Sequence, residues 1–228
     1  MVSGKLALAN SVAAGALALS FCTCAGAADL TRRPPPPPLM PVPMWKGLYV
    51  GGHIGGVTTS ETATDIFGFS ASPDPSGFLG GAQVGYNYQV APNWLIGIEG
   101  EFSGTSASGT SVGFQSDHRW YSTLDARWGY VMGSWLLYAK GGGAWMNADY
   151  SVPGESVNVT RGGWNIGAGA EFMLAPQWSA KAEYTFLDFG NDTVGFPFTG
   201  PVAVDTRVHE FKFGVNYHFA PGAVFGRW

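Results

Sequence analysis

The sequence has few charged residues, and cysteine occurs in it only near the N-terminus. Asp, Glu, Lys and Arg together make up 12 % of its 228 residues, which is about half of their usual share in soluble domains. The formal net charge is -4, so the chain has no general positive charge to attract nucleic acid. Glycine and aromatic residues are abundant instead, with 34 glycines and 14 % Phe, Trp and Tyr.

The first 28 residues have the pattern of a secretory signal peptide. Lys5 precedes an apolar run over residues 6–21, and small residues at 25–28 offer a cleavage site before Asp29. A membrane anchor is the alternative, but the apolar run is short and the small residues follow it at once. Both cysteines lie inside this segment, so the mature chain is expected to have no disulfide framework.

No later segment has the roughly 20 consecutive apolar residues that a membrane-spanning helix needs. A closed β-barrel is the other structure that can cross a bilayer. Residues 29–44 contain five consecutive prolines at 34–38, which predict an extended linker, expected to be periplasmic. A ligand for a proline-binding partner is the alternative for this segment.

From Trp45 onward the sequence alternates between apolar and polar residues with a period of two. In the segment 118–132, for example, Trp120, Leu124 and Trp128 lie on one face, and Asp125 and Arg127 on the other. This alternation over ten or more residues is typical of a tilted transmembrane strand. The predicted strands are 47–57, 77–90, 94–104, 116–132, 135–146, 161–174, 178–189 and 206–219.

The predicted connections alternate between short and long. The short ones are 91–93, 133–134 and 175–177, and the long polar ones are 58–76, 105–115, 147–160 and 190–205. Short turns on the periplasmic side and longer external loops are typical of bacterial outer-membrane barrels. We therefore predict an all-β fold, an eight-stranded antiparallel up-and-down transmembrane β-barrel over residues 45–219, followed by a short extension over 220–228.

Charged residues fall in the middle of the predicted strands, on the polar face. In a membrane barrel they must face a narrow lumen and pair there, because an unpaired buried charge is costly. A soluble eight-stranded carrier would instead expose them around an apolar cavity. The predicted lumen charge network consists of Glu99, Glu101, Arg119, Asp125, Arg127, Lys140, Glu171, Lys181, Glu183, Glu210 and Lys212.

The last predicted strand resembles the C-terminal assembly signal of outer-membrane barrels. Lys212, Gly214, Tyr217 and Phe219 match its polar, glycine, aromatic and hydrophobic positions. The resemblance implies recognition by the barrel-assembly machinery. The signal usually ends the chain, whereas this sequence continues to Trp228.

Three further segments extend the resemblance over residues 28–219. The segments 45–52 (WKGLYVGG), 137–142 (LYAKGG) and 184–190 (YTFLDFG) resemble the small alphaproteobacterial outer-membrane proteins of the OmpA-like and opacity-like β-barrel family. That family implies a barrel in the cell outer membrane, in contact with its lipid and lipopolysaccharide. It also implies a contribution to envelope integrity and contact with a host or surface ligand.

The sequence predicts no catalytic residue, metal site or cofactor. A lipid A-modifying enzyme would need a nucleophile and a base together, and His118 beside Ser116 and Asp117 is the best candidate. We interpret it as an ordinary solvated strand end. His53 and His218 are expected to be hydrogen-bonding groups in the lumen.

A narrow porin-like channel is the other alternative function. About eight strands leave an interior that side chains just fill, and Tyr49, Tyr121 and Tyr138 are expected to help fill it. The favoured function is therefore a structural outer-membrane barrel whose outer loops make contacts. The loop aromatics expected to be exposed are Phe67, Phe69, Phe78, Phe196 and Phe198.

Overall fold

The computed structural model describes residues 45–65, 67–111, 113–197 and 200–220. The predicted signal segment 1–28 and linker 29–44 lie outside these residues, as does the predicted extension from residue 221 onward. Every regular element in the described part of the chain is a β-strand. Among the same residues, no helix has the length and hydropathy needed to cross a bilayer.

Ten antiparallel strands follow one another along the described part of the chain. They are β1 (Gly47–Thr64), β2 (Ser70–Ala71), β3 (Ser76–Ala91), β4 (Trp94–Thr105), β5 (Ser108–Ser111), β6 (Phe114–Met132), β7 (Trp135–Val152), β8 (Glu155–Ala175), β9 (Trp178–Phe196) and β10 (Gly200–His218).

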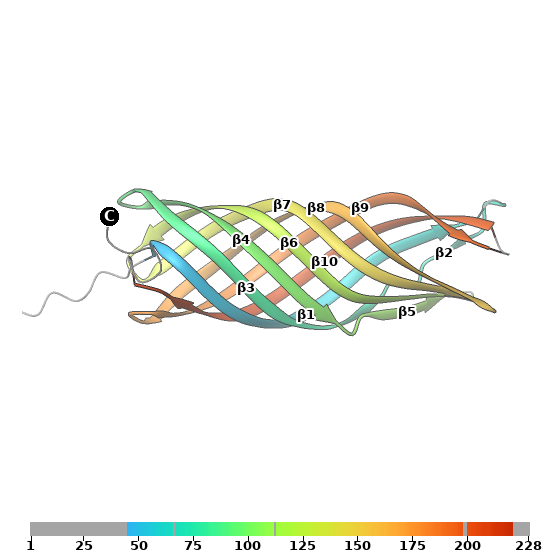
Figure 1. Ribbon diagram of the computed structural model, residues 1–228, viewed down its shortest axis with the longest axis horizontal. Helices are drawn as coiled ribbons and strands as arrows, with labels where there is room; N and C mark the ends of the chain where they lie inside the picture. The colour runs from blue at the N-terminus through green and yellow to red at the C-terminus, as the bar shows by residue number, and fades with distance from the viewer. Residues whose placement is uncertain (1–44, 66, 112, 198–199, 221–228) are drawn as a thin grey trace, which may run out of the picture. The chain divides into compact units, whose positions relative to one another are not determined.

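The eight long strands form a closed ring, and the short strands β2 and β5 join it at one end. Each long strand pairs with the next long strand along the chain, and the first and last of them, β1 and β10, pair over most of their length. The ladder from Gly47↔Asn87 to Thr58↔Ser76 joins β1 to β3 on its other edge. Figure 1 shows these strands tilted around the barrel. The fold is therefore the predicted eight-stranded up-and-down β-barrel.

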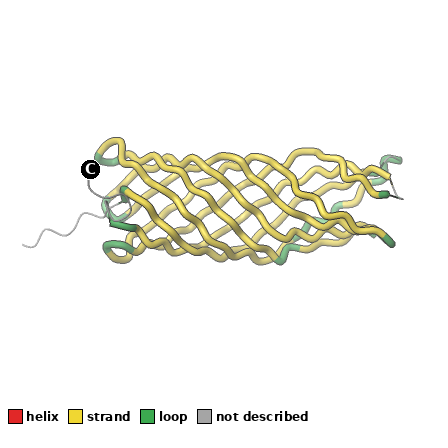
Figure 2. The backbone as a smooth tube through the Cα atoms, in the orientation of Figure 1, coloured by secondary structure: helices red, strands yellow, loops and turns green. Residues whose placement is uncertain are grey.

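The two ends of the barrel differ. Tight turns follow Ala91, Met132 and Ala175 at the end where β1 begins and β10 finishes, and we call this the turn end. The opposite end carries the longer connections, and we call it the loop end. In Figure 2 the tube is strand over nearly all of its length, with loops at the two ends and short loop segments in the half nearer the loop end.

The long connections are shorter than the sequence predicted. Most residues expected in loops at 58–76, 105–115, 147–160 and 190–205 instead continue the flanking strands or form β2 and β5. Their inward-facing apolar side chains, such as Val204, are buried in an apolar cluster inside the barrel. This burial stabilises strands that are longer than a membrane requires.

Two of the expected loop aromatics, Phe67 and Phe69, are exposed at the loop end, and Phe78 is exposed on β3. Phe196 was expected to be exposed, but it is buried in the interior apolar cluster because it lies on the inward face of β9. Phe198 lies outside the described residues.

The two faces of the barrel wall have opposite chemistry. On β6, Asp125 and Arg127 are 2 % exposed, whereas Leu124 is 59 % and Trp128 is 60 % exposed. Successive side chains of a strand point to opposite faces, so the alternation places polar groups inside and apolar groups outside. An apolar outer surface of this kind is suited to contact with lipid hydrocarbon and not with water.

Two groups of aromatic side chains lie on the outer wall. Near the turn end, Trp94 stacks on Trp128 with ring centroids 5.1 Å apart, and Trp178 meets Tyr217 at 5.1 Å. Nearer the loop end, Phe102 stacks on Trp120 at 5.7 Å. Aromatic rings favour the boundaries between hydrocarbon and water. We call these groups the lower and upper girdles, and the wall between them is the membrane-spanning part.

Close strand packing depends on a glycine that faces the lumen. A Cβ atom at Gly142 would collide with the main-chain oxygen of Leu124 on the neighbouring strand, whereas at Gly100 the nearest atom is 4.0 Å away. We expect Gly142→Ala to lower the free energy of unfolding by about 1–3 kcal/mol through overpacking. The measurement is urea unfolding of the detergent-folded protein. Gly100→Ala is the matched control, and equal effects of the two substitutions would contradict this explanation.

Candidate functional site

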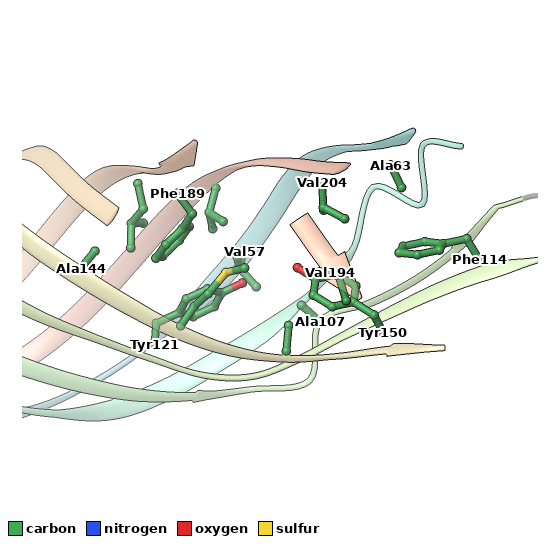
Figure 3. Close-up of a cluster of buried hydrophobic side chains, with 14 of the residues drawn as sticks. Val57, Ala63, Ala107, Phe114, Tyr121, Ala144, Tyr150, Phe189, Val194 and Val204 are labelled. Carbon is green, nitrogen blue, oxygen red and sulfur yellow. The ribbon is translucent and has the colours of Figure 1, made fainter. Parts of the chain in front are cut away.

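The interior of the barrel consists of three layers. An apolar cluster closes the turn end, a charged layer fills the middle, and a second apolar cluster occupies the loop end. The turn-end cluster consists of Trp45, Leu95, Val131, Leu136, Tyr138 and Met173. Figure 3 shows the loop-end cluster, in which side chains from different strands, including Tyr121, Val57 and Phe189, point into the lumen.

Strand register brings the charges of the middle layer together. Glu99 of β4 pairs with Asp125 of β6, and Glu171 of β8 pairs with Lys181 of β9. The buried charged side chains of this layer are Glu99, Glu101, Asp125, Arg127, Lys140, Glu171, Lys181, Glu183, Glu210 and Lys212. They come from six strands, so their contacts cross the lumen as well as following the wall.

Lys140 lies at the centre of this network. Its Nζ atom is 2.8 Å from Glu183, 3.2 Å from Glu99 and from Asp125, and 3.3 Å from Glu101. A single ammonium group from β7 therefore contacts carboxylates from β4, β6 and β9. Its side chain is fully buried, so these contacts replace the water molecules that would otherwise solvate the ammonium group.

Two more lysines join the same carboxylates. The Nζ atom of Lys212 is 3.0 Å from Glu210 and 3.2 Å from Glu183, and it also contacts Glu101. The Nζ atom of Lys181 is 3.4 Å from Glu183 and 3.7 Å from Glu99. Strands β9 and β10 are thus tied to β4 across the lumen.

Arg127 forms the part of the network nearer the turn end. Its guanidinium is 3.3 Å from Glu99 and 3.2 Å from Glu171. It also lies over the ring of Tyr138 at 3.9 Å and over that of Tyr49 at 5.3 Å, and cation–π attraction adds to the ion pairs. Both tyrosines are buried in the lumen, as expected from the sequence, and so is Tyr121.

Glu171 ends the network toward the turn end. It accepts hydrogen bonds from Asn216 at 2.7 Å and from the Ser179 hydroxyl, and His218 lies 3.2 Å away. Deeper in the barrel, His53 bonds Gln83 at 2.6 Å and Ser103 at 2.8 Å. Both histidines are hydrogen-bonding groups in the lumen, as the sequence predicted.

The layer holds six carboxylates and four fixed cations. Glu99, Glu101 and Glu183 place oxygens within 4.8 Å of one another, which is close enough for a metal ion. However, Lys140 contacts all three of these residues. A lysine ammonium thus occupies the position that a metal ion would need, and the arrangement suits a fixed ion-pair network better.

The predicted network was wrong about Arg119. Its side chain is 64 % exposed and pairs with Asp149 on the outer wall. The ladder between β6 and β7 shifts register between His118 and Trp120, and such a bulge reverses the order of inward and outward residues. The simple alternation on which the prediction rested therefore fails at this point.

The expectation that His118 is solvated was also wrong. His118 is buried, bonds the Tyr121 hydroxyl at 2.6 Å and lies 3.5 Å from Glu61. Ser116 donates to Glu61 at 2.9 Å and not to the histidine. A catalytic nucleophile must face its base and the substrate, and this buried cluster, which includes Ser116, lacks that arrangement.

Tyr150 lies beside this cluster, on the loop-end side of the upper girdle. Burial, with the nearby charge of Glu61, raises the pKa of Tyr150 to about 12. The phenol is therefore neutral at physiological pH and brings no second negative charge close to Glu61.

Sequence reasoning missed Arg161 and Glu61. Both are buried near the loop end, where the sequence predicted a loop boundary and a loop. Arg161 shares the odd-numbered face of β8 with the buried Asn165 and Glu171. Following the alternation from Asn165 back by four residues, to the first residue of the predicted strand, would have placed Arg161 inside.

Comparison with known proteins agrees with this geometry. Residues 14–219 match the family described as outer membrane protein beta-barrel domain. The chain belongs to this family. It is 31 % identical over 239 residues to the 31 kDa outer-membrane immunogenic protein of Brucella melitensis, and the alignment covers 92 % of this chain and 100 % of the relative. It is 26 % identical to the 22 kDa outer membrane protein of Rhizobium leguminosarum, over 67 % and 68 % of the two chains.

Solved structures support the same fold. The outer-membrane protein AlkL, determined in lipid bilayers, aligns with a TM-score of 0.51 and 12 % identity, over 82 % of this chain and 97 % of AlkL. OprG from Pseudomonas aeruginosa aligns with a TM-score of 0.50 and 13 % identity, over 76 % and 97 %. With the family match and the apolar outer wall, the protein is a surface-exposed β-barrel of the outer membrane.

Lys140 provides a direct test of the ion-pair network. We expect Lys140→Met to lower the free energy of unfolding by about 3–5 kcal/mol, because it leaves several buried carboxylates without a partner. Arg119→Met removes an exposed ion pair and should cost less than about 1 kcal/mol. Tryptophan fluorescence during urea unfolding of the detergent-folded proteins measures both. A Lys140→Met protein as stable as Arg119→Met would contradict the network.

Proposed function

We propose that this barrel is a structural component of the outer membrane that contributes to envelope integrity and makes contacts through its loop end. The observation that carries the proposal is the filled interior, in which charged side chains from six strands bind one another across the lumen. Such an interior favours a rigid scaffold, since movement of any one wall would separate buried charges.

A non-enzymatic role is part of the proposal. The relatives described above are named as outer-membrane proteins and not as enzymes. In addition, Ser116, His118 and Glu61 are buried together and lack the geometry of an activated serine. A wide channel is also disfavoured, because Arg127, Lys140 and Lys212 lie in the lumen with fully buried side chains.

Family topology supports an orientation for the barrel. Short turns face the periplasm and longer connections face outward in bacterial outer-membrane barrels. The loop end would then meet lipopolysaccharide and the environment. Its exposed Phe67 and Phe69 supply apolar contact area for a host or surface ligand.

The first test is fractionation of cells that express the full chain, followed by electrophoresis of boiled and unboiled outer membranes. We expect the protein in the outer membrane, with faster migration before boiling because the folded barrel is compact. Planar bilayers containing the purified protein should show no stable conductance. A soluble periplasmic protein without a heat shift would overturn the proposal, and a stable conductance would favour a channel.

The resemblance to an assembly signal yields a separate prediction. We expect Phe219→Ala to reduce the heat-shifted, assembled fraction in cells several-fold, because the barrel-assembly machinery would lose an aromatic recognition group. Refolding of the purified variant in detergent should remain near normal, which separates recognition from stability. Phe211→Ala, on the outer face of β10, is the control. Equal loss in both variants, or failure of Phe219→Ala to refold, would contradict a recognition role.

A further inference from the structure

Strands β8 and β9 separate near the loop end. Their ladder runs from the turn end to Trp164↔Asp188 and stops there. Both strands nevertheless continue, β8 back to Glu155 and β9 on to Phe196, each paired with its other neighbour. Beyond the upper girdle, the part of the wall that the structure describes therefore has a seam between two strand edges.

A bulge in β9 accounts for the seam. Asp205 of β10 pairs with Asn191, but Arg207 pairs with Asp188, so β9 has one extra residue at this point. Gly190 has a φ of 62°, a left-handed conformation that glycine adopts without steric cost. A bulge bends its strand and ends regular pairing, so β9 turns away from β8 here.

Arg161 closes the base of the seam. From β8, its guanidinium donates to the main-chain oxygens of Gly190 at 3.0 Å and Val204 at 2.9 Å, and to the Thr206 hydroxyl at 2.8 Å. Asp192 lies 3.7 Å from its Nε atom. The Arg161 side chain thus takes the place of backbone hydrogen bonds between β8 and β9 at the base of the seam, and not farther toward the loop end.

Strand β1 also continues beyond its ladder with β3, which begins at Ser76, but the chain just before β3 bridges this edge. The main-chain nitrogen of Thr59 donates to the oxygen of Pro75 at 2.8 Å, and that of Glu61 donates to the Asp74 carboxylate at 3.0 Å. Among the described residues, positions 156–160 of β8 have no comparable bridge to β9, and Arg161 alone spans the seam at its base.

The two edges of the seam differ in protection. On β9, Asp188 accepts from the Gly190 nitrogen at 2.8 Å and Asp192 from the Thr193 nitrogen at 2.9 Å, so a charged, bulged edge discourages pairing. The β8 edge over residues 156–160 has the sequence Ser-Val-Asn-Val-Thr. It contains no charge, proline, glycine or bulge, which are the features that normally protect an edge strand.

We propose that the β8 edge, residues 156–160, binds an extended polypeptide segment of a partner protein by strand addition. Unpaired main-chain donors and acceptors recognise another backbone. Val157 and Val159 are half-buried against the loop-end apolar cluster, so a segment with apolar side chains at alternate positions fits best. That the partner lies outside the cell rests on the proposed function, in which the loop end of the barrel faces outward.

The probe is a blocked synthetic heptapeptide, KVTVTVK, with alternating valines and terminal lysines. The lysines suit the acidic Asp149 and Asp192 near the edge. Hydrogen exchange of the detergent-folded full chain is measured with and without excess peptide. We expect slowing of at least five-fold for the amides of residues 156–160. A peptide with proline at its central valine should give no slowing, because proline has no N–H to donate.

A pair of lysine substitutions tests the edge itself. Ser156→Lys with Thr160→Lys places charges on exposed positions of the β8 edge and should abolish the slowing, since edge lysines oppose strand addition. Thr58→Lys with Thr62→Lys has the same spacing on exposed positions of β1, which is paired there with β10. This control should respond to the peptide like the unchanged protein.

The remaining outcomes decide against the proposal. Absence of slowing at saturating peptide, or equal slowing in the edge variant, would overturn it. Slowing that depends on protein concentration without peptide would assign the edge to a second copy of the chain instead. Because exchange is measured on folded protein in detergent, these results do not depend on where the protein resides in the cell, which fractionation tests separately.

Discussion

Hydrocarbon offers no hydrogen bonds to a polypeptide backbone, and this constraint shapes the barrel. Every strand between the girdles must be paired on both edges, which the ring achieves by joining β1 to both β10 and β3. Closure gives each strand one face toward lipid, so its polar residues must point into a narrow interior. The charges there lie in direct contact with opposite charges, as Lys140 and its surrounding carboxylates show.

The layered interior strengthens these contacts. Apolar clusters above and below the charged layer reduce access of water, and ion pairs are stronger where the local dielectric is low. The same burial makes loss of one partner costly. The constraint is weaker at the loop end. Strands that extend beyond the lipid can separate there, because water can hydrogen-bond their unpaired backbone groups. The bulge at Gly190 and the Arg161 contacts belong to this freer region.

Alternation in the sequence was enough to predict the ring of strands, the tight turns and most of the lumen charges. Asp125 and Arg127 lie where a period of two placed them. Arg119 does not, because a bulge shifts the period, and nothing in the local sequence marks that bulge. The length of β8 was underestimated because Ser156 to Thr160 is polar enough to resemble a loop. Contacts such as Arg161 with Val204 depend on how distant strands meet, which no single-strand pattern contains.

Trp45 lies just before β1 and is completely buried at the turn end. Its indole nitrogen donates to the oxygen of Gly133 in the turn between β6 and β7, at 3.3 Å, and its ring meets that of His218 at the end of β10, at 5.7 Å. Tension applied along the chain from its N-terminal side would reach this indole before it reached the β1 ladder. Because the indole contacts β10 and the distant turn, such a load would be spread around the rim of the ring and would not peel β1 away alone.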